Sequence, residues 1–410
     1  MKIRPFCGIR PRDELAKDVI APPYDVISEP EARALRSDNH KSFLRITRPE
    51  VDLEEGIDSH SEDAYQMAKA NLGRFIDQGW LVQDQDRGFY LYSQTWQGRT
   101  QTGLMATCAV KDYDSGLIKK HELTRPDKEQ DRVDHMEALS AQPGLVFLAY
   151  RDNVPSIKAA MDKASSLDPA WAVVTEDGVE HRLTPVLDPA SVEALTSAFS
   201  QAPAFYIADG HHRSAAASRV SAARGQGGQS GWFLAGLFPD SELEILAYNR
   251  VVKDLAGMSK DAFLGAIAET FVLTPHTDPN PTGRGHWTMY LDGQWYGLRA
   301  RPGVVPEADP VGRLDVAVLQ NEILDPLLKI KNPRTDTRIQ FVGGVRGHEA
   351  LSSRVDSGEA AVAFHLFPTG LDQLFNVADA DMLMPPKSTW FEPKLRGGVV
   401  MHSIASDLSP

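Results

Sequence analysis

A short glycine-containing turn carries the residues best suited to bind an anion. Asp209, Gly210, His211, His212 and Arg213 follow an apolar run and precede an alanine-rich segment. Gly210 permits a sharp turn from a strand into a helix, and a helix that begins there presents unpaired backbone N–H groups. The two imidazoles and the guanidinium add side-chain donors. We predict a phosphate site here; the alternative is a capped helix start with two exposed histidines.

A dense polar stretch upstream offers groups that complement such a site. Within residues 119–135, five Lys or Arg side chains are balanced by five Asp or Glu side chains. Phosphoryl transfer needs cations for phosphate oxygens and a carboxylate that orients a hydroxyl group, whereas a solvated, salt-bridged loop and helix would have the same composition. The candidate residues of this stretch are Lys119, Lys120, His121, Glu122, Thr124, Arg125 and Lys128.

Two other motifs are weaker. In residues 384–396 (MPPKSTWFEPKLR), Lys387 and Lys394 either reach a nucleotide or lie at the surface, and Lys387 is the one we include in the predicted site. No GxxxxG precedes Lys387, so this is not a Walker A loop. Near the N-terminus, a proline pair keeps Tyr24 and Asp25 on a loop, where they are candidates to contact a substrate.

Several kinds of site are not predicted. Arg125 stands where a zinc protease motif beginning at His121 would need its second histidine. The two cysteines, Cys7 and Cys108, are too few for a disulfide framework or a four-ligand zinc site, and they favour a reducing compartment. No GxSxG motif is present to indicate a nucleophilic serine.

The composition is that of an ordinary globular protein. The chain has 410 residues, of which 42% are hydrophobic and 24% charged, and at roughly 150 residues per domain this length favours two or three domains. The formal net charge of −13 opposes non-specific binding to nucleic acid. No apolar stretch approaches about 18 residues, so we expect no membrane partner and a cytoplasmic location.

The elements that position these groups alternate between strand and helix. The clearest predicted strands cover residues 88–110 as a hairpin, 145–150 and 203–208, and a second strand pair is expected at 232–238 and 243–252. The fold class is therefore α/β or α+β, with mixed sheets, flanking helices and two lobes. We expect an N-terminal α+β region at 1–115, a phosphate-binding core at 116–273 and a C-terminal α+β region at 274–410.

Four blocks in this order resemble the bacterial and archaeal family known as domain of unknown function 1015. They begin at Ala21 (APPYDV), Ile118 (IKKHELTRPDKEQDRVDH), Ile207 (IADGHHRSAAA) and Met384 (MPPKSTWFEPKLR). Within them, DGHHR resembles the phosphate motif of free serine kinases of the ParB and sulfiredoxin superfamily. That resemblance implies a ParB/sulfiredoxin-like nucleotide-binding core. The anion loop lacks the cysteine of sulfiredoxins, which disfavours redox repair.

The resemblance implies a kinase that transfers a phosphoryl group from ATP or ADP, with Mg²⁺, to the hydroxyl of free L-serine. His121-Glu122 resembles the upstream pair whose glutamate is the catalytic base. The separation from Glu122 to Asp209 is longer than in the compact kinases, which implies an insertion or another topology. A phosphoserine phosphatase or phosphotransferase, and a non-catalytic ParB-like nucleotide switch, are the alternatives, and a homodimer is compatible with the sequence.

The predicted roles divide the candidate residues into three groups. Glu122, His121, Asp209 and His212 are assigned to catalysis, with Asp209 also holding the metal ion. The phosphate and nucleotide group is Gly210, His211, Arg213, Lys119, Lys120, Arg125, Lys128 and Lys387. Tyr24, Asp25 and Thr124 are assigned to the substrate.

Overall fold

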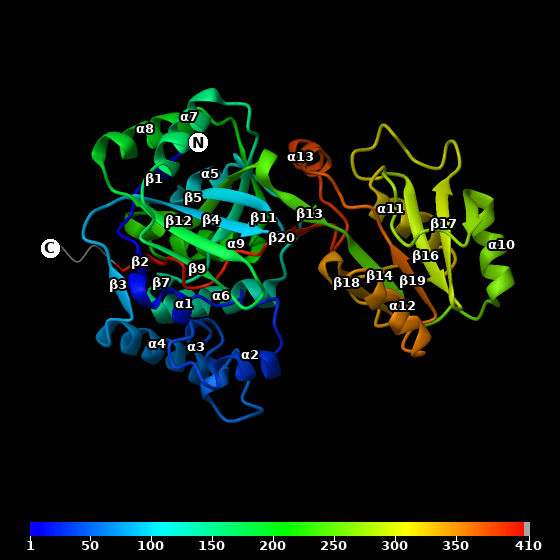
Figure 1. The fold of residues 1–410 in the computed structure, drawn as a ribbon, viewed down its shortest axis with the longest axis horizontal. Coiled ribbons are helices and arrows are strands. Elements are labelled where there is room, and N and C mark those ends of the chain that lie inside the picture. Colours follow the sequence, from blue (N-terminus) through cyan, green and yellow to red (C-terminus); the bar gives the residue numbers. More distant parts are fainter. Residues whose placement is uncertain (406–410) are drawn as a thin grey trace. The chain divides into compact units, whose positions relative to one another are not determined.

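The computed structural model describes residues 1–405, which form two compact units (Figure 1). Unit 1 comprises Met1–Leu243 and the segment that begins at Pro393, and unit 2 comprises Glu244–Glu392. The chain thus leaves unit 1 after Leu243 and re-enters it at Pro393; we call residues 393–405 the return segment. The mixed α/β class is confirmed, whereas the boundaries expected after residues 115 and 273 stay predictions.

A nine-stranded mixed sheet forms the centre of unit 1. Its order is β6 (Ile118–Lys119), β11 (Phe205–Asp209), β8 (Val146–Tyr150), β12 (Trp232–Pro239), β5 (Arg99–Ala109), β4 (Phe89–Trp96), β10 (Glu180–Val186) and β9 (Trp171–Val174), with β1 (Ile3–Arg4) beside β5. β6 runs parallel to β11, and β8 runs parallel to β12. The other neighbours in the sheet are antiparallel.

Alternation along β4 explains how the two faces of this sheet are covered. Successive side chains of a strand point to opposite faces. Phe89 and Leu91 belong to the apolar core completed by α7 (Pro155–Ser165), α8 (Pro189–Phe199) and α9 (His211–Ala223). Tyr90 and Gln94, in the alternate positions, meet the N-terminal segment at Gly8 and the return segment at Lys394. One face is therefore covered by helices and the other by irregular chain.

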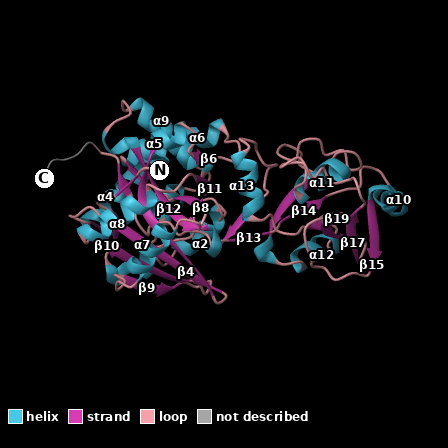
Figure 2. Cartoon of the chain, turned by 90° about the horizontal axis from the view of Figure 1, so that it is seen from above, coloured by secondary structure: helices cyan, strands magenta, loops and turns pink. Residues whose placement is uncertain are grey.

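A helical layer adjoins the sheet within unit 1. Its helices are α1 (Ala16–Val19), α2 (Glu29–Arg36), α3 (Leu44–Thr47) and α4 (Glu62–Asp77). Ser28 caps α2 through a capping box with Glu31. α6 (Pro126–Leu139) packs against both α4 and α9, and α5 (Val110–Asp114) packs against α9. Figure 2 shows α5, α6 and α9 lying together along one side of unit 1.

Unit 2 contains a six-stranded antiparallel sheet. Its order is β15 (Phe271–Pro275), β17 (Gln294–Ala300), β16 (His286–Leu291), β19 (Val362–His365), β14 (Tyr248–Val252) and β18 (Ile339–Gly343). Its helices are α10 (Lys260–Thr270), α11 (Asp315–Leu319), α12 (Glu349–Asp356) and α13 (Leu371–Asp379). A separate ribbon pairs the first strand of the unit, β13 (Glu244–Leu246), with its last, β20 (Trp390–Glu392).

Two short ribbons complete unit 1. They pair β2 (Ile9–Pro11) with β3 (Leu81–Gln83), and β7 (Ala141–Gln142) with β21 (His402–Ser403).

The expected pairing of 232–238 with 243–252 is wrong: β12 pairs with β5 and β8, whereas β14 belongs to the sheet of unit 2. Both runs are rich in apolar residues, but this pattern does not show which strand is the partner.

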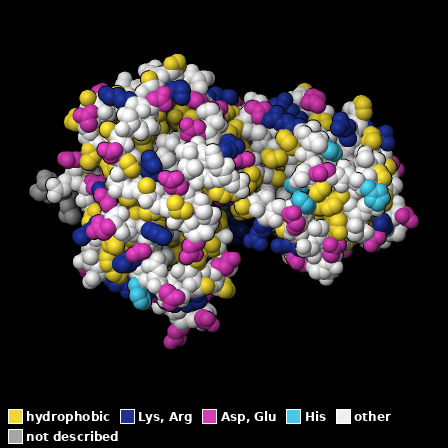
Figure 3. All heavy atoms as spheres, viewed as in Figure 1, with side chains coloured by type: hydrophobic (Ala, Val, Ile, Leu, Met, Phe, Trp, Pro, Cys, Tyr) yellow, Lys and Arg dark blue, Asp and Glu magenta, His cyan; other side chains and the backbone are white. Residues whose placement is uncertain are grey.

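Within residues 1–405, no helix has the length and apolar character that crossing a membrane requires. On the face of unit 1 drawn in Figure 3, basic and acidic side chains are interspersed.

Candidate active site

The upstream polar stretch and the DGHHR turn begin at the same end of the sheet, because the strands that precede them, β6 and β11, are parallel neighbours. Parallel strands end at the same side of a sheet, so the residues that follow them are brought together. His121 follows β6, and His211 follows β11. Their imidazole rings lie 4.5 Å apart, nearly perpendicular to each other. The structure thus joins the upstream stretch to the DGHHR turn.

Gly210 makes the turn between β11 and α9 geometrically accessible. Its φ of +100° lies in the left-handed region, which side chains of L-residues disfavour. A Cβ atom at this position would lie 3.2 Å from Arg213 Nε and 3.3 Å from Val146 Cα. A register irregularity between Ile207 and Asp209 in β11 adjoins the same turn. Both the backbone conformation and the lack of space therefore favour glycine.

Helix α9 begins at His211 with no side chain capping its first N–H groups. The backbone N–H groups of its first turn have no partner within the helix, and its N-terminus carries a partial positive charge. His211 and Arg213 are both buried. The alternative of two exposed histidines is therefore wrong for His211. The start of α9 therefore offers N–H donors at the turn where the sequence predicts a phosphate site, and the binding of phosphate there stays a prediction.

The two buried histidines are neutral and incompletely hydrogen-bonded. Burial lowers the pKa of His121 to about 4, and burial together with the neighbouring His121 lowers the pKa of His211 well below its ordinary value. Among the described residues, His121 Nδ1 and His211 Nε2 have no hydrogen-bond partner. An unpaired buried polar atom is costly unless a ligand or water satisfies it. These two nitrogens are thus available to a bound molecule.

Asp209 is held between two cations. Its Oδ2 lies 3.2 Å from Lys394 Nζ, and its Oδ1 lies 3.7 Å from Arg213 Nη2. Burial by itself would raise the pKa of Asp209, but the charges of Lys394 and Arg213 outweigh burial and lower that pKa. Asp209 is therefore an anion throughout the neutral range, and it fixes both cations beside the start of α9.

His212 links the starts of α6 and α9. The backbone N–H of Arg125, the residue before α6, donates to His212 Nε2 at 3.1 Å. Burial lowers the pKa of His212, which favours its neutral form with the proton on Nδ1. His212 therefore connects the upstream stretch directly to the DGHHR turn.

Arg213 extends from α9 toward the N-terminal loop. Its Nη1 donates to the carbonyl of Leu145, and its Nη2 lies 4.0 Å from Asp25 Oδ2. Tyr24 lies beside it, with the guanidinium of Arg132 positioned 4.3 Å from the centre of the Tyr24 ring. Burial raises the pKa of Tyr24, so its hydroxyl stays protonated. The structure thus brings both predicted substrate residues to Arg213.

The remaining residues of the upstream stretch have other surroundings. Lys120 Nζ lies 3.9 Å from the centre of the Tyr113 ring, Thr124 donates to Glu129, and Lys128 Nζ lies 3.5 Å from His60 Nε2. The side chain of Arg125 is exposed and pairs with Asp127. Lys119 lies on β6 and Glu122 lies in the connection to α6, both half-buried. Their roles stay predictions.

Lys387 belongs to unit 2, where its Nζ lies 5.5 Å from the centre of the Tyr248 ring. Its assignment to a nucleotide stays a prediction.

Two residues of the site were missing from the predicted set. Lys394 comes from the return segment, and Arg132 from α6. The only sequence signal for Lys394 was its place in the block around MPPKSTWFEPKLR, where Lys387 was chosen instead. Arg132 lay within the charged stretch, but nothing in its spacing distinguished it from a solvated helix residue.

No group of three or more His, Cys, Asp or Glu side chains within residues 1–405 is arranged to hold a metal ion. A magnesium ion bound mainly by phosphate oxygens and water needs only one carboxylate. The carboxylate predicted for it, Asp209, is already compensated by Lys394 and Arg213. The described residues therefore do not form a metal site held by the protein alone.

Comparison with protein families gives one match. A family model described as "Protein of unknown function (DUF1015)" matches residues 3–317, which is more than half of the chain. The comparison with curated proteins gave no match.

Solved structures give distant likenesses. SbnI with C-terminal truncation from Staphylococcus aureus is 11% identical, with 73% of this chain and 88% of that chain covered and a TM-score of 0.40. A free serine kinase in complex with AMP is 10% identical, with 70% and 86% covered and a TM-score of 0.35. A conserved hypothetical protein from Pyrococcus furiosus is 12% identical, with 70% and 90% covered and a TM-score of 0.34. At TM-scores this low, no function follows from these likenesses.

Proposed function

The chain belongs to the DUF1015 family of proteins of unknown function, and we propose that it is a nucleotide-dependent phosphotransferase that phosphorylates the hydroxyl group of free L-serine. The observation that carries this proposal is the convergence of one buried helix start, two cations and two unsatisfied imidazoles at the edge shared by β6 and β11. The choice of serine rests on the resemblance of the DGHHR motif to free serine kinases.

The start of α9 binds the transferred phosphoryl group in this proposal. The unpaired N–H groups of its first turn, Arg213 and Lys394 face the negative charge, and the neutral His121 and His211 donate or accept hydrogen bonds without adding charge. Because Asp209 holds the two cations in place before a ligand arrives, little reorganisation is needed in the transition state. Asp209 is thus a positioning residue, and no step is routed through a metal ion.

Glu122 is the proposed base. It takes the proton of the serine hydroxyl while that oxygen forms a bond to the phosphorus atom, and the bond from phosphorus to the bridging oxygen of the nucleotide breaks. The products are O-phosphoserine and ADP when ATP is the donor, or AMP when ADP is the donor. Glu122 follows His121 on the connection from β6 to α6, so it leaves the sheet at the same edge as the DGHHR turn.

The direct test is product identification. The full chain is incubated with labelled ATP or ADP, Mg²⁺ and a panel of free hydroxy amino acids. We expect labelled O-phosphoserine with at least one donor. If no phosphorylated amino acid forms with either nucleotide, the kinase proposal is wrong. Incubation with O-phosphoserine alone, and with O-phosphoserine and ADP, distinguishes hydrolysis and the reverse transfer from a non-catalytic nucleotide switch.

A further inference from the structure

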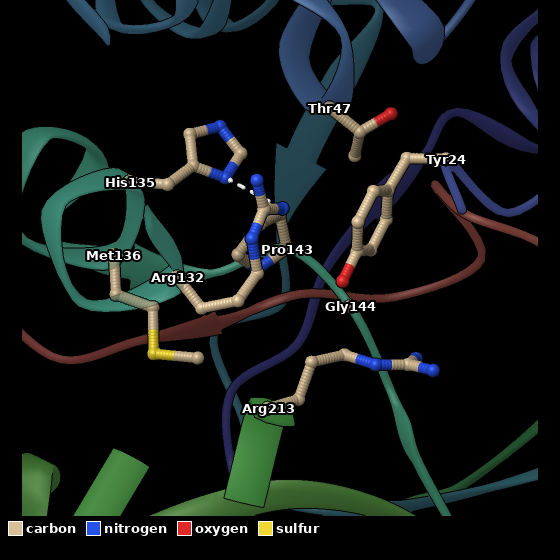
Figure 4. A pocket seen from close by; sticks show the side chains of 8 residues that line it. All are labelled: Tyr24, Thr47, Arg132, His135, Met136, Pro143, Gly144 and Arg213. Atoms are coloured by element: carbon tan, nitrogen blue, oxygen red, sulfur yellow. Dashed lines mark hydrogen bonds between the residues drawn. The ribbon is translucent and has the colours of Figure 1, made fainter. Parts of the chain in front are cut away.

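A small cavity lies beside the Arg213 side chain. Its volume is about 20 Å³, which is room for one or two water-sized groups. The residues that line it are Tyr24, Thr47, Arg132, His135, Met136, Pro143, Gly144 and Arg213 (Figure 4). It therefore draws its walls from the N-terminal loop, α3, α6, the chain before β8, and α9.

On one side of the cavity, Arg213 can still donate hydrogen bonds to a bound molecule. Arg213 Nη2 lies 3.7 Å from Asp209 and 4.0 Å from Asp25, both beyond hydrogen-bond distance. Its Nη1 is occupied by the Leu145 carbonyl. Gly144 permits this placement, because a Cβ there would lie 3.3 Å from Arg213 Cδ. One edge of the guanidinium is thus fixed by the backbone and the other is open to a ligand.

Arg132 forms a second wall with N–H donors, and its charge and orientation are fixed by its pairing with Asp131. Its Nε donates to Asp131 Oδ2 at 2.8 Å, while Nη1 lies 3.5 Å from His135 Nδ1. His135 Nε2 donates to the Ile46 carbonyl, which leaves its Nδ1 as an acceptor. Burial lowers the pKa of His135 to about 3, and the Arg132 guanidinium is paired with the ionised Asp131, so this wall offers N–H donors but no net positive charge.

Tyr24 supplies a neutral donor between the two guanidiniums. Figure 4 shows its hydroxyl directed toward the side of the cavity where Arg213 lies. Within residues 1–405, the Tyr24 hydroxyl makes no hydrogen bond, and its ring is held against the Arg132 guanidinium. Two guanidiniums and a phenolic O–H beside a small cavity are donors of the kind that suits a carboxylate.

We propose that this cavity binds the α-carboxylate of the acceptor amino acid. The inference rests on the proposed function and adds the group by which the acceptor is recognised. Arg213 then lies between the phosphoryl group at the start of α9 and the carboxylate in the cavity, and its single guanidinium holds the two substrates at a fixed separation. Arg132 and Tyr24 contact the carboxylate alone. An acceptor without a carboxylate has nothing to bind at this position.

The test is a binding measurement that does not depend on turnover. Isothermal titration of the full chain, with a non-transferable nucleotide analogue present, compares L-serine, L-homoserine and L-alanine with ethanolamine and L-serinamide, which lack a carboxylate. We expect the three amino acids to bind about 10- to 100-fold more tightly, the range given by hydrogen bonds to a charged group. Equal binding of L-serinamide and L-serine would overturn the carboxylate site, even if serine is phosphorylated.

Substitutions assign the recognition to the cavity. Tyr24→Phe removes one hydroxyl and should weaken L-serine about tenfold. Arg132→Gln should weaken L-serine binding further. This substitution leaves Asp131 unpaired, so the double variant Asp131→Asn/Arg132→Gln replaces it if the single variant does not fold. Neither should change nucleotide affinity. Arg182→Gln, an exposed arginine on β10 paired with Glu180, is the matched control.

The two proposals fail in different ways. If amino acids bind through their carboxylate but none is phosphorylated, the phosphotransferase proposal fails and the carboxylate site stands. If serine is phosphorylated while Tyr24→Phe and the Arg132 variants bind it as the parent chain does, the cavity is not the carboxylate site. If no amino acid binds at all, the inference is overturned.

Discussion

Lys394 Nζ lies 3.2 Å from Asp209 Oδ2, a pairing between residues 185 positions apart. Lys394 is the second residue of the return segment, directly after unit 2 ends at Glu392. Asp209 ends β11, one residue before the turn into α9. The charge beside the proposed phosphate site therefore depends on how the return segment is seated on the sheet.

Removal of this cation should weaken nucleotide binding. We expect Lys394→Met to raise the dissociation constant for ADP about tenfold, because Asp209 then places an incompletely compensated carboxylate beside the phosphate groups. Isothermal titration measures the change. Lys158→Met, which removes an exposed lysine of α7 paired with Asp162, should bind ADP as the parent chain does. Unchanged affinity in Lys394→Met would contradict the proposed place of the nucleotide.

Two buried glutamines position Lys394 through its backbone. Gln94 Nε2 donates to the Lys394 carbonyl at 2.8 Å, and Gln101 Nε2 donates both to Gln94 Oε1 at 2.9 Å and to the Pro393 carbonyl at 3.2 Å. We expect Gln94→Met to weaken ADP binding in the parent chain by about threefold to tenfold, because it frees a buried carbonyl that anchors the return segment.

A double-mutant cycle tests this positioning role. In a chain that already carries Lys394→Met, the additional Gln94→Met substitution should have little effect on ADP affinity, because the group it positions is gone. Equal losses in both backgrounds would mean that Gln94 only stabilises the fold.

Two variants should distinguish residues needed for phosphoryl transfer from residues needed for nucleotide binding. Glu122→Gln keeps the shape of the side chain but cannot take a proton, so we expect phosphoryl transfer to fall by at least about 100-fold with nearly unchanged affinity for ADP. Arg213→Ala should lower the affinity for ADP, because it removes a guanidinium beside the start of α9. Initial rates and titrations on both variants are the measurements. A Glu122→Gln chain that turns over normally would remove Glu122 from the mechanism.

The turn at Gly210 should not tolerate a side chain. Gly210→Ala combines a left-handed backbone with contacts of 3.2 Å to Arg213 Nε and 3.3 Å to Val146 Cα, so we expect a loss of about 2–4 kcal/mol in unfolding free energy. Gly225→Ala separates the two effects: its φ is +84° with no atom within 4 Å, and it should cost about 1 kcal/mol. Denaturant midpoints compare them, and equal losses would mean that crowding at Gly210 is relieved elsewhere.

Acid should destabilise unit 1 through its buried histidines. The pKa of His121 is about 4 in the folded chain against an ordinary value of 6.5. Between these two pH values, His121 is therefore protonated in the unfolded chain and neutral in the folded chain. The stabilisation is complete above pH 6.5 and is lost as the pH falls toward 4, up to about 3 kcal/mol. The denaturant midpoint should therefore fall more steeply with acid in the parent than in His121→Gln. Parallel curves would show that another group governs this range.

The sequence predicted the parts of the fold that depend on local patterns. The strands at 145–150 and 203–208 and the hairpin of β4 and β5 follow from apolar runs and turn residues. The turn from strand to helix at Gly210 followed for the same reason, since a strand, a glycine and a helix are consecutive in the chain.

Contacts between distant segments were beyond the sequence. The approach of His121 to His211 requires β6 to be the parallel neighbour of β11, and the pair of Lys394 with Asp209 requires the chain to return from unit 2. The alternation of apolar and polar residues along a strand indicates which side chains share a face of the sheet. It does not indicate which other strand lies beside it. The predicted pairing of 243–252 was wrong for this reason, and the sequence contains nothing that distinguishes Lys394, which pairs with Asp209, from Lys387.

The ribbon of β13 and β20 pairs Glu244 with Glu392, so the first and last residues of unit 2 are direct neighbours. No strand of the nine-stranded sheet is encoded between them. Unit 2 is therefore an insertion between two segments of unit 1 that interrupts no strand of that sheet. Lys394 lies two residues after this insertion ends, so among the residues of the proposed nucleotide site it is the one nearest in sequence to a junction between the units.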